Sequence, residues 1–252
     1  MRLALLQAPS PAADDEAAFA TLAAALNAAG AMGAATLTAP EIYLPGYNQP
    51  DIPARAQPRG GAWHQRLATL CRAAGCGIVI GYAERAGERV YNSAIAIDAA
   101  GREIAHYRKL QLYGPRENAI YTVGDAYTLF NLHGRTAALL ICYDVEFAPH
   151  IAALADRGAS LILCPTANML PYTHVARVTV PAMAVNHAVT IAYANFCGSE
   201  GDLDYAGGSV IAGPDGEIIA QAGAHPALLV VDLPAAYDPA RMSTQARDLR
   251  SL

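Results

Sequence analysis

Residues 135–147 have the sequence RTAALLICYDVEF, in which a buried strand leads directly to a reactive side chain. Residues 135–141 are strongly apolar, which is typical of a short strand buried on both faces. The strand ends at Cys142, and a helix is expected to follow over 147–157. A thiol at the end of a buried strand is either an inert core side chain or a nucleophile held at the edge of a sheet.

Strands and helices are expected along the rest of the chain. Apolar runs between turn residues predict strands at 3–7, 35–40, 77–82, 90–99, 102–107, 127–131, 161–163 and 190–195, and a last hairpin around 214–216. Helical periodicity predicts helices at 14–29, 62–74, 147–157 and 174–187. Residues 45–61 and 112–125 are expected to be irregular. Because no linker or repeat interrupts 1–252, we expect a single α/β domain.

The composition excludes several functional classes. Of 252 residues, 54% are hydrophobic and only 15% are charged, which excludes a disordered chain. The net charge of −5 provides no basic surface for nucleic acid or a membrane, so a small-molecule partner is expected. The five cysteines contain no C-x-x-C pair, so neither a disulfide framework nor a zinc site is indicated. Without a signal-peptide pattern or a bilayer-spanning apolar run, a cytoplasmic location is expected.

Three reactive side chains each follow a predicted strand. Glu41 follows 35–40, Lys109 follows the hairpin that ends at 107, and Cys142 follows 135–141. Loops at strand ends project over the edge of a sheet while the strands hold them rigidly, so such side chains often meet in one crevice. A cysteine attacks as the thiolate, and its ordinary pKa of about 8.5 means that a nearby base and a nearby cation assist it. Glutamate and lysine would supply both.

The segments around these residues form a recognisable series. In chain order they are Pro40-Glu41, Pro45-Gly46-Tyr47, Tyr91-Asn92-Ser93, Tyr107-Arg108-Lys109, Leu112-Tyr113-Gly114 and Ile141 to Phe147. Together they resemble the nitrilase superfamily of carbon-nitrogen hydrolases, in which an acid follows the second strand, a lysine follows a hairpin and a cysteine follows a later strand. The resemblance extends over nearly the whole chain.

The resemblance implies a role for each reactive residue. Cys142 would be the nucleophile, Glu41 the general base and Lys109 the cation that faces the developing oxyanion. Glu117 would be a second glutamate that positions the substrate or the lysine, and the backbone amide of Tyr143 would complete the oxyanion hole. The implied fold is a four-layer αββα sandwich of two mixed sheets, and the implied assembly is a homodimer or a larger homo-oligomer. Neither a metal nor an organic cofactor is implied.

Later segments suggest a branch within the superfamily. Cys164 to Met169, Tyr193-Ala194-Asn195 and Cys197-Gly198 look most like the short-chain amidases, and among these like the 5-aminopentanamidases. The similarity implies that a small linear aliphatic amide, such as 5-aminopentanamide, is hydrolysed to the carboxylic acid and ammonia. The thioester formed with the cysteine would be the intermediate.

Four residues are expected to contact the substrate. Tyr47 and Asn168 lie within motifs that carry the resemblance. Glu200 and Asp202 belong to an acidic run over 200–204 that could bind a distal ammonium group, or could be a solvated turn. Because Arg157 is the only arginine between Cys142 and residue 171, an acid-terminated substrate would lack a cationic partner, and we expect it to be disfavoured.

Some alternatives stay open on the sequence. The same three residues could serve an N-carbamoyl amino acid amidohydrolase, an ω-amidase or a nitrilase. A cysteine-histidine hydrolase is disfavoured because no glycine flanks Cys142, and a non-catalytic binding protein could share the scaffold. Two segments depart from the family pattern: Ala148-Pro149-His150 replaces the expected Pro-Glu pair, and 181–187 lacks the usual arginines and Glu-Asn pair.

Overall fold

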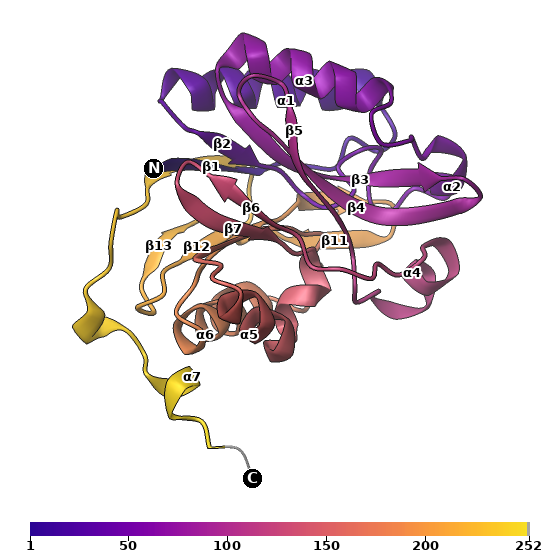
Figure 1. Ribbon diagram of the computed structural model, residues 1–252. Helices are drawn as coiled ribbons and strands as arrows, with labels where there is room; N and C mark the ends of the chain where they lie inside the picture. Colours follow the sequence, from indigo (N-terminus) through magenta and orange to yellow (C-terminus); the bar gives the residue numbers. More distant parts are fainter. Residues whose placement is uncertain (251–252) are drawn as a thin grey trace.

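The computed structural model describes residues 1–250, and its first layer of strands is a mixed sheet built mainly from the first half of the chain (Figure 1). Parallel pairing joins the first three strands in the chain, and antiparallel pairing joins the others. In spatial order the strands are β14 (Ala227–Asp232), β1 (Arg2–Gln7), β2 (Thr36–Thr38), β3 (Gly77–Ala86), β4 (Arg89–Ile97) and β5 (Glu103–Arg108).

The second sheet has the same number of strands and is also mixed. Its central strands are parallel and its outer pairs are antiparallel. In spatial order they are β13 (Ile218–Gln221), β12 (Val210–Ala212), β9 (Thr190–Ala194), β8 (Leu161–Pro165), β7 (Arg135–Leu139) and β6 (Leu129–Leu132). A separate hairpin is formed by β10 (Cys197–Glu200) and β11 (Leu203–Ala206).

Helices cover the outer faces of both sheets. Helices α1 (Asp15–Ala31) and α3 (Ala62–Ala74) lie over the first sheet, and α5 (Ala148–Asp156) and α6 (Val180–Asn186) lie over the second (Figure 1). The expected four-layer αββα sandwich is therefore confirmed. The shorter helical elements are α2 (Ile52–Arg55), α4 (Gly114–Ile120), the 3-10 helices η1 (Cys142–Glu146) and η3 (Pro239–Arg241), the π-helix η2 (Val175–Thr179) and α7 (Gln245–Asp248).

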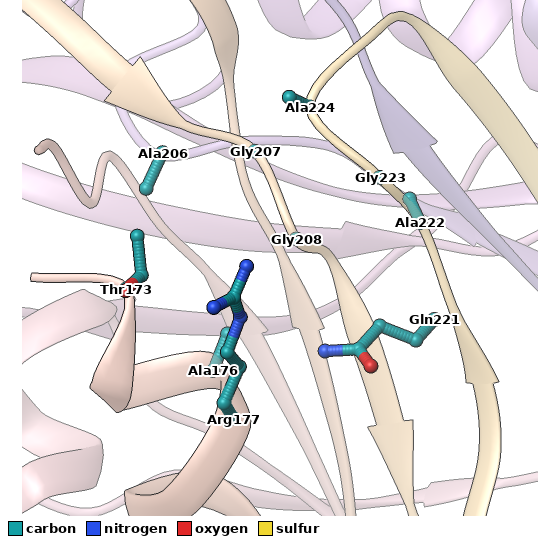
Figure 2. A pocket seen from close by; sticks show the side chains of 10 residues that line it. All are labelled: Thr173, Ala176, Arg177, Ala206, Gly207, Gly208, Gln221, Ala222, Gly223 and Ala224. Carbon is teal, nitrogen blue, oxygen red and sulfur yellow. The ribbon is translucent and has the colours of Figure 1, made fainter.

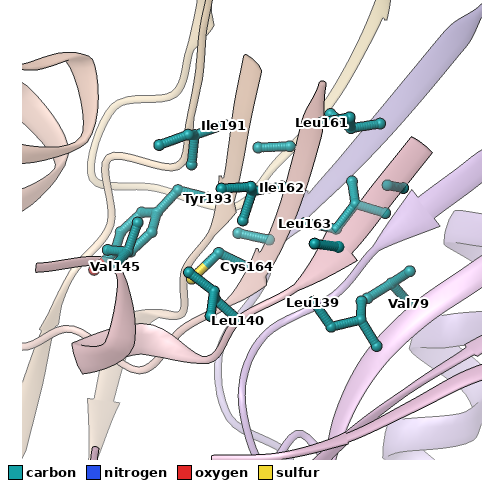
Figure 3. Close-up of a cluster of buried hydrophobic side chains, with 14 of the residues drawn as sticks. Val79, Leu139, Leu140, Val145, Leu161, Ile162, Leu163, Cys164, Ile191 and Tyr193 are labelled. Atoms are coloured by element: carbon teal, nitrogen blue, oxygen red, sulfur yellow. The ribbon is translucent and has the colours of Figure 1, made fainter. Parts of the chain in front are cut away.

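The core lies in two parts because successive strand residues point to opposite faces. In β3, Val79 faces the second sheet and packs in the same cluster as Leu139 and Leu163 (Figure 3). Its neighbours Ile78 and Ile80 belong to the cluster that packs under α1 and α3. All five of these side chains are fully buried, so the strands read as continuous apolar runs instead of alternating patterns.

Local signals set the ends of the long helices. Asp14 precedes α1, and its side chain accepts a hydrogen bond from the Ala17 amide at 2.9 Å, which satisfies a free N–H of the first turn. Helix α3 ends at Gly75, which has the left-handed conformation (φ 61°) that glycine adopts without steric cost. These signals explain why 62–74 was predicted to the residue and why 14–29 was displaced by only one or two positions at each end.

Several elements were not predicted from the sequence, among them the short helix α2 within 45–61, which was expected to be irregular. Residues 112–125 were expected to be irregular, but they contain α4, which is too short to show helical periodicity and begins with Pro115 in its first turn. The β10–β11 hairpin includes the acidic run 200–204, and β14 pairs with β1 across most of the chain length. Such pairings depend on contacts far apart in sequence.

In the described residues, no helix has the length and apolarity needed to span a membrane.

Candidate active site

The side chain of Lys109 lies between two buried carboxylates. Its ammonium donates to Glu41 Oε1 at 2.7 Å and to both carboxylate oxygens of Glu117, at 2.8 and 2.9 Å. Glu41 follows β2, Lys109 follows β5, and Glu117 belongs to α4. All three side chains are almost fully withdrawn from solvent. The structure therefore brings together two of the three residues predicted at strand ends, Glu41 and Lys109, with the second glutamate.

Neighbouring groups hold the two carboxylates in place. Asn92 donates to Glu41 Oε1 at 2.6 Å, and its backbone oxygen accepts the Lys109 amide at 2.8 Å. The Tyr47 hydroxyl and the Tyr113 amide donate to Glu117 at 2.7 and 2.9 Å. The second oxygen of Glu41, Oε2, is buried and has no hydrogen-bond partner within residues 1–250. That oxygen is the one free to accept a proton.

Cys142 occupies a strained turn at the start of η1. Its φ of +45° lies in the left-handed region, which is uncommon for residues other than glycine and costs on the order of 1–3 kcal/mol. Ile42, next to Glu41, has a φ of +43°, although its side chain is β-branched. Gly81 allows this second turn, because a Cβ there would lie 2.5 Å from the Glu41 Cα. Strain of this kind is maintained only where the surrounding structure determines the backbone.

Asp144 ties the Cys142 turn to the loop that carries Lys109. Its carboxylate accepts from the Ile141 amide at 3.0 Å, from the Gln111 amide at 2.7 Å and from the Tyr107 hydroxyl at 2.8 Å. Asp144 is fully buried. It therefore caps η1 and at the same time connects the second sheet to the end of β5.

Burial and charge set the protonation of the three central groups. Burial raises the pKa of Glu41 to about 7, against the attraction of Lys109, and Glu117 adds to the rise. Burial lowers the pKa of Lys109, but the charges of Glu117 and Glu41 outweigh it and hold that pKa well above its ordinary value. Burial and the charge of Glu41 raise the pKa of the Cys142 thiol, which Lys109 opposes. At neutral pH, Lys109 is therefore an ammonium and Cys142 is a neutral thiol. The Glu41 carboxyl is close to the midpoint of its titration.

A cavity of about 320 Å³ opens beside Cys142. Its volume is at the lower end of the range for small-molecule sites, about 300–1,000 Å³. Three tyrosines form part of its wall: the ring of Tyr113 meets the rings of Tyr143 and Tyr172 edge to face, at 5.3 and 6.3 Å between centroids. The lining comprises Tyr47, Tyr113, Cys142, Tyr143, Glu146, Ala167, Asn168, Met169, Tyr172, His174 and Val175.

Two of the four predicted substrate contacts line this cavity, and two do not. Tyr47 and Asn168 belong to the lining. Glu200 is instead buried in β10, where it accepts hydrogen bonds from Tyr205 and Gln49, both at 2.5 Å. Asp202 is exposed at the tip of the hairpin and belongs to a neighbouring hollow. The acidic run is therefore a hairpin turn outside the cavity.

Several residues of the site were missed in the sequence. Glu146 lies in η1 four residues after Cys142, and His174 lines the same cavity. The helical spacing from Cys142 was a usable signal for Glu146, whereas no local pattern indicated His174. His150, in a segment that departs from the family pattern, bonds Tyr127 at 2.7 Å and Gln111 at 3.0 Å, behind the Cys142 turn.

A separate hollow of about 160 Å³ lies between the segment after β11 and the strand β13 (Figure 2). Arg177 and Gln221 project into it from opposite sides, and glycines 207, 208 and 223 form its wall. Its lining contains neither a cysteine nor a carboxylate, so the cavity at Cys142 is the candidate active site. Among residues 1–250, no three histidine, cysteine or acidic side chains gather closely enough to hold a metal ion.

Comparisons with known proteins agree with this geometry. The model of the family described as carbon-nitrogen hydrolase matches residues 2–241. A Pseudomonas protegens protein named "hydrolase in pqqF 5′ region" is 43% identical over 198 residues, covering 77% of this chain and 70% of its own. An (R)-stereoselective amidase from Pseudomonas sp. is 33% identical over 199 residues, covering 78% and 72%.

A solved structure resembles the whole chain. The amidase from Nesterenkonia sp. AN1 superposes with a TM-score of 0.91 at 36% identity, covering 99% of this chain and 94% of that one. That structure is of a cysteine-to-alanine variant in complex with butyramide. Another structure of the same amidase shows acrylamide added to its active-site cysteine.

Proposed function

This chain belongs to the carbon-nitrogen hydrolase family and is an enzyme that hydrolyses carbon–nitrogen bonds, and on this premise we propose that its substrate is a short linear aliphatic amide. The products are the carboxylic acid and ammonia. The observation that carries the proposal is the ammonium of Lys109 held between Glu41 and Glu117, beside a strained cysteine that lines a small cavity.

The first half of the reaction forms a thioester on Cys142. Glu41 Oε2 accepts the thiol proton as the sulfur attacks the amide carbonyl carbon. The negative charge that develops on the carbonyl oxygen faces the Lys109 ammonium and the Tyr143 amide, which lies in the first turn of η1 and lacks an acceptor within the helix. When the carbon–nitrogen bond breaks, Glu41 returns the proton to the leaving nitrogen, and ammonia departs.

The second half releases the acid. Glu41, again a carboxylate, takes a proton from water as the water oxygen attacks the thioester carbon. The same two donors stabilise the second oxyanion, and the carbon–sulfur bond breaks as Glu41 returns the proton to sulfur. The pKa of Glu41, near 7, suits both directions of transfer, because a general base and acid works best when its pKa is close to the working pH.

The cavity supports a short and uncharged or amine-terminated substrate. Its volume of about 320 Å³ favours a chain of a few carbons, and tyrosine rings form much of the wall. Within the described residues, the lining contains neither lysine nor arginine, so an acid-terminated amide would have only His174 as a basic partner and would share the cavity with the Glu146 carboxylate. Butyramide, which is bound in a structure of the Nesterenkonia amidase, is likewise a short linear amide with a chain of a few carbons. We propose 5-aminopentanamide as the substrate to test first.

An ammonia-release screen tests the proposal. The substrates are propionamide, butyramide, 5-aminopentanamide, glutaramate, N-carbamoyl-β-alanine and butyronitrile, each assayed with the wild-type enzyme and with Cys142→Ala. We expect the highest kcat/KM among the neutral and amine-terminated amides, and none with Cys142→Ala. A higher kcat/KM for glutaramate, the carbamoyl compound or the nitrile would refute the substrate class while leaving the chemistry at Cys142 intact.

A further inference from the structure

Glu146 places an unpaired carboxylate in the cavity beside Cys142. It is the single carboxylate of the cavity lining in the described chain, and it is partly buried. Glu41 and Glu117 lie nearby, but both already bond Lys109. No hydrogen bond or ion pair joins the Glu146 carboxylate to another residue of 1–250, and the cationic side chains whose charges act on it are His174 and Lys109. Because this carboxylate is partly withdrawn from water and has no bonded partner, a cationic group that enters the cavity can pair with it.

The aromatic wall is complementary to the same group. Tyr113, Tyr143 and Tyr172 line the cavity with Glu146 and contact one another edge to face. The faces of aromatic rings attract an ammonium group with about 0.5–1 kcal/mol at exposed sites and more when the group is desolvated. His174, also in the lining, is exposed to solvent.

The spacing along η1 sets the length of a matching ligand. Glu146 follows Cys142 by four residues on a 3-10 helix, whose rise of about 2.0 Å per residue gives roughly 8 Å along the axis. In 5-aminopentanamide, five bonds of about 1.5 Å separate the carbonyl carbon from the nitrogen, and an extended zigzag of them spans roughly 6 Å. The extended chain of 5-aminopentanamide therefore matches the axial spacing of Cys142 and Glu146 to within about 2 Å.

We propose that Glu146 binds the terminal ammonium group of a linear ω-amino amide while the amide carbonyl of that substrate faces Cys142. The inference rests on the proposed amidase function and assigns its distal specificity to one residue. It also replaces the expectation that Glu200 and Asp202 bind the ammonium, since Glu200 is satisfied by Tyr205 and Gln49.

The test compares 5-aminopentanamide with hexanamide, in which a methyl group replaces the ammonium group. The kcat/KM ratio of the two amides is measured for the wild type, for Glu146→Gln and for Glu88→Gln. Glu88 is exposed in the β3–β4 turn, so Glu88→Gln is the matched control for the loss of one carboxylate. Because hydrogen bonds to charged groups are worth about 1.5–3 kcal/mol, we expect the ratio to fall about 10- to 100-fold in Glu146→Gln alone.

The outcomes separate the inference from the proposed function. If Glu146→Gln lowers kcat/KM equally for both amides, or leaves their ratio unchanged, the ammonium is held elsewhere and the inference is wrong, although amide hydrolysis stands. If the wild type releases ammonia from neither amide, the proposed function fails. The inference is then decided by calorimetric binding to Cys142→Ala: 5-aminopentanamide must bind more tightly than hexanamide, and Glu146→Gln must abolish the difference.

Discussion

Replacing Glu117 by Gln removes one of the two carboxylates that bond the Lys109 ammonium, and it tests how the charges of the site set the working pH. Glu41 has a pKa of about 7, and the charge of Glu117 is one of the causes that raise it. As the base, Glu41 must be ionised, so kcat/KM of the wild type should fall as the pH drops through about 7. Without Glu117 the pKa of Glu41 should fall, and this acidic limb should move to lower pH.

The size of the shift follows from the geometry. Glu41 Oε1 and Glu117 Oε1 both accept from the Lys109 Nζ, at 2.7 and 2.8 Å. Around a tetrahedral ammonium these oxygens lie about 4.5 Å apart. At that distance, and with an effective dielectric constant of about 20, two unit charges interact by roughly 4 kcal/mol. Because one pKa unit is 1.36 kcal/mol, we expect a shift of about 1 to 3 pH units.

The assay is the initial rate of ammonia release from butyramide between pH 4.5 and 9, with Glu88→Gln as the control for loss of an exposed carboxylate. We also expect kcat of Glu117→Gln to fall by about 10²-fold, because Lys109 loses part of its anchorage and small displacements of a catalytic group are costly. An acidic limb that stays in place, or that moves to higher pH, would refute the assignment of Glu41 as the base influenced by Glu117.

Further variants test single parts of the mechanism. Cys142→Ala should abolish ammonia release without changing the thermal unfolding midpoint, because only the nucleophile is lost. Glu41→Gln should slow the alkylation of Cys142 by iodoacetamide, followed by mass spectrometry, because an amide does not accept the thiol proton; an unchanged rate would contradict its role as base. Lys109→Met should lower kcat and kcat/KM together by about 10²-fold or more, whereas a change in KM alone would exclude an oxyanion role. Gly81→Ala places a Cβ 2.5 Å from the Glu41 Cα and should cost about 1–3 kcal/mol of stability in urea unfolding, whereas Gly223→Ala, whose Cβ meets nothing within 4 Å, should be neutral.

The identity of the central residues was available from the sequence because each follows a local signal. Glu41, Lys109 and Cys142 come after apolar runs, and such runs encode strands through short-range periodicity. The long helices were predicted for the same reason, with Asp14 and Gly75 at their ends. A helix as short as α4 carries no periodic signal, so Glu117 could be placed only by its resemblance to a family motif.

The contacts of the site were decided by tertiary structure. Lys109 meets Glu41 across 68 residues once the strands of the first sheet have paired. Asp144 reaches Gln111 across 33 residues, and this bond forms only after the two sheets have packed together. The lack of a partner for one oxygen of Glu41 and the positive φ of Cys142 arise only in the folded chain. No local propensity encodes these features, because a left-handed cysteine is unfavourable by itself and is maintained by its surroundings.

The sequence by itself therefore determined the order of the strands' reactive side chains and predicted which of them would carry the chemistry. It did not determine which acid lines the cavity beside Cys142. The run containing Glu200 and Asp202 is conspicuous in the sequence, but a hairpin turns it away from Cys142, whereas Glu146 is placed in the cavity by one short helix. Charge in a sequence is a property of each residue, but the partner and exposure that make it functional depend on the packing of distant elements.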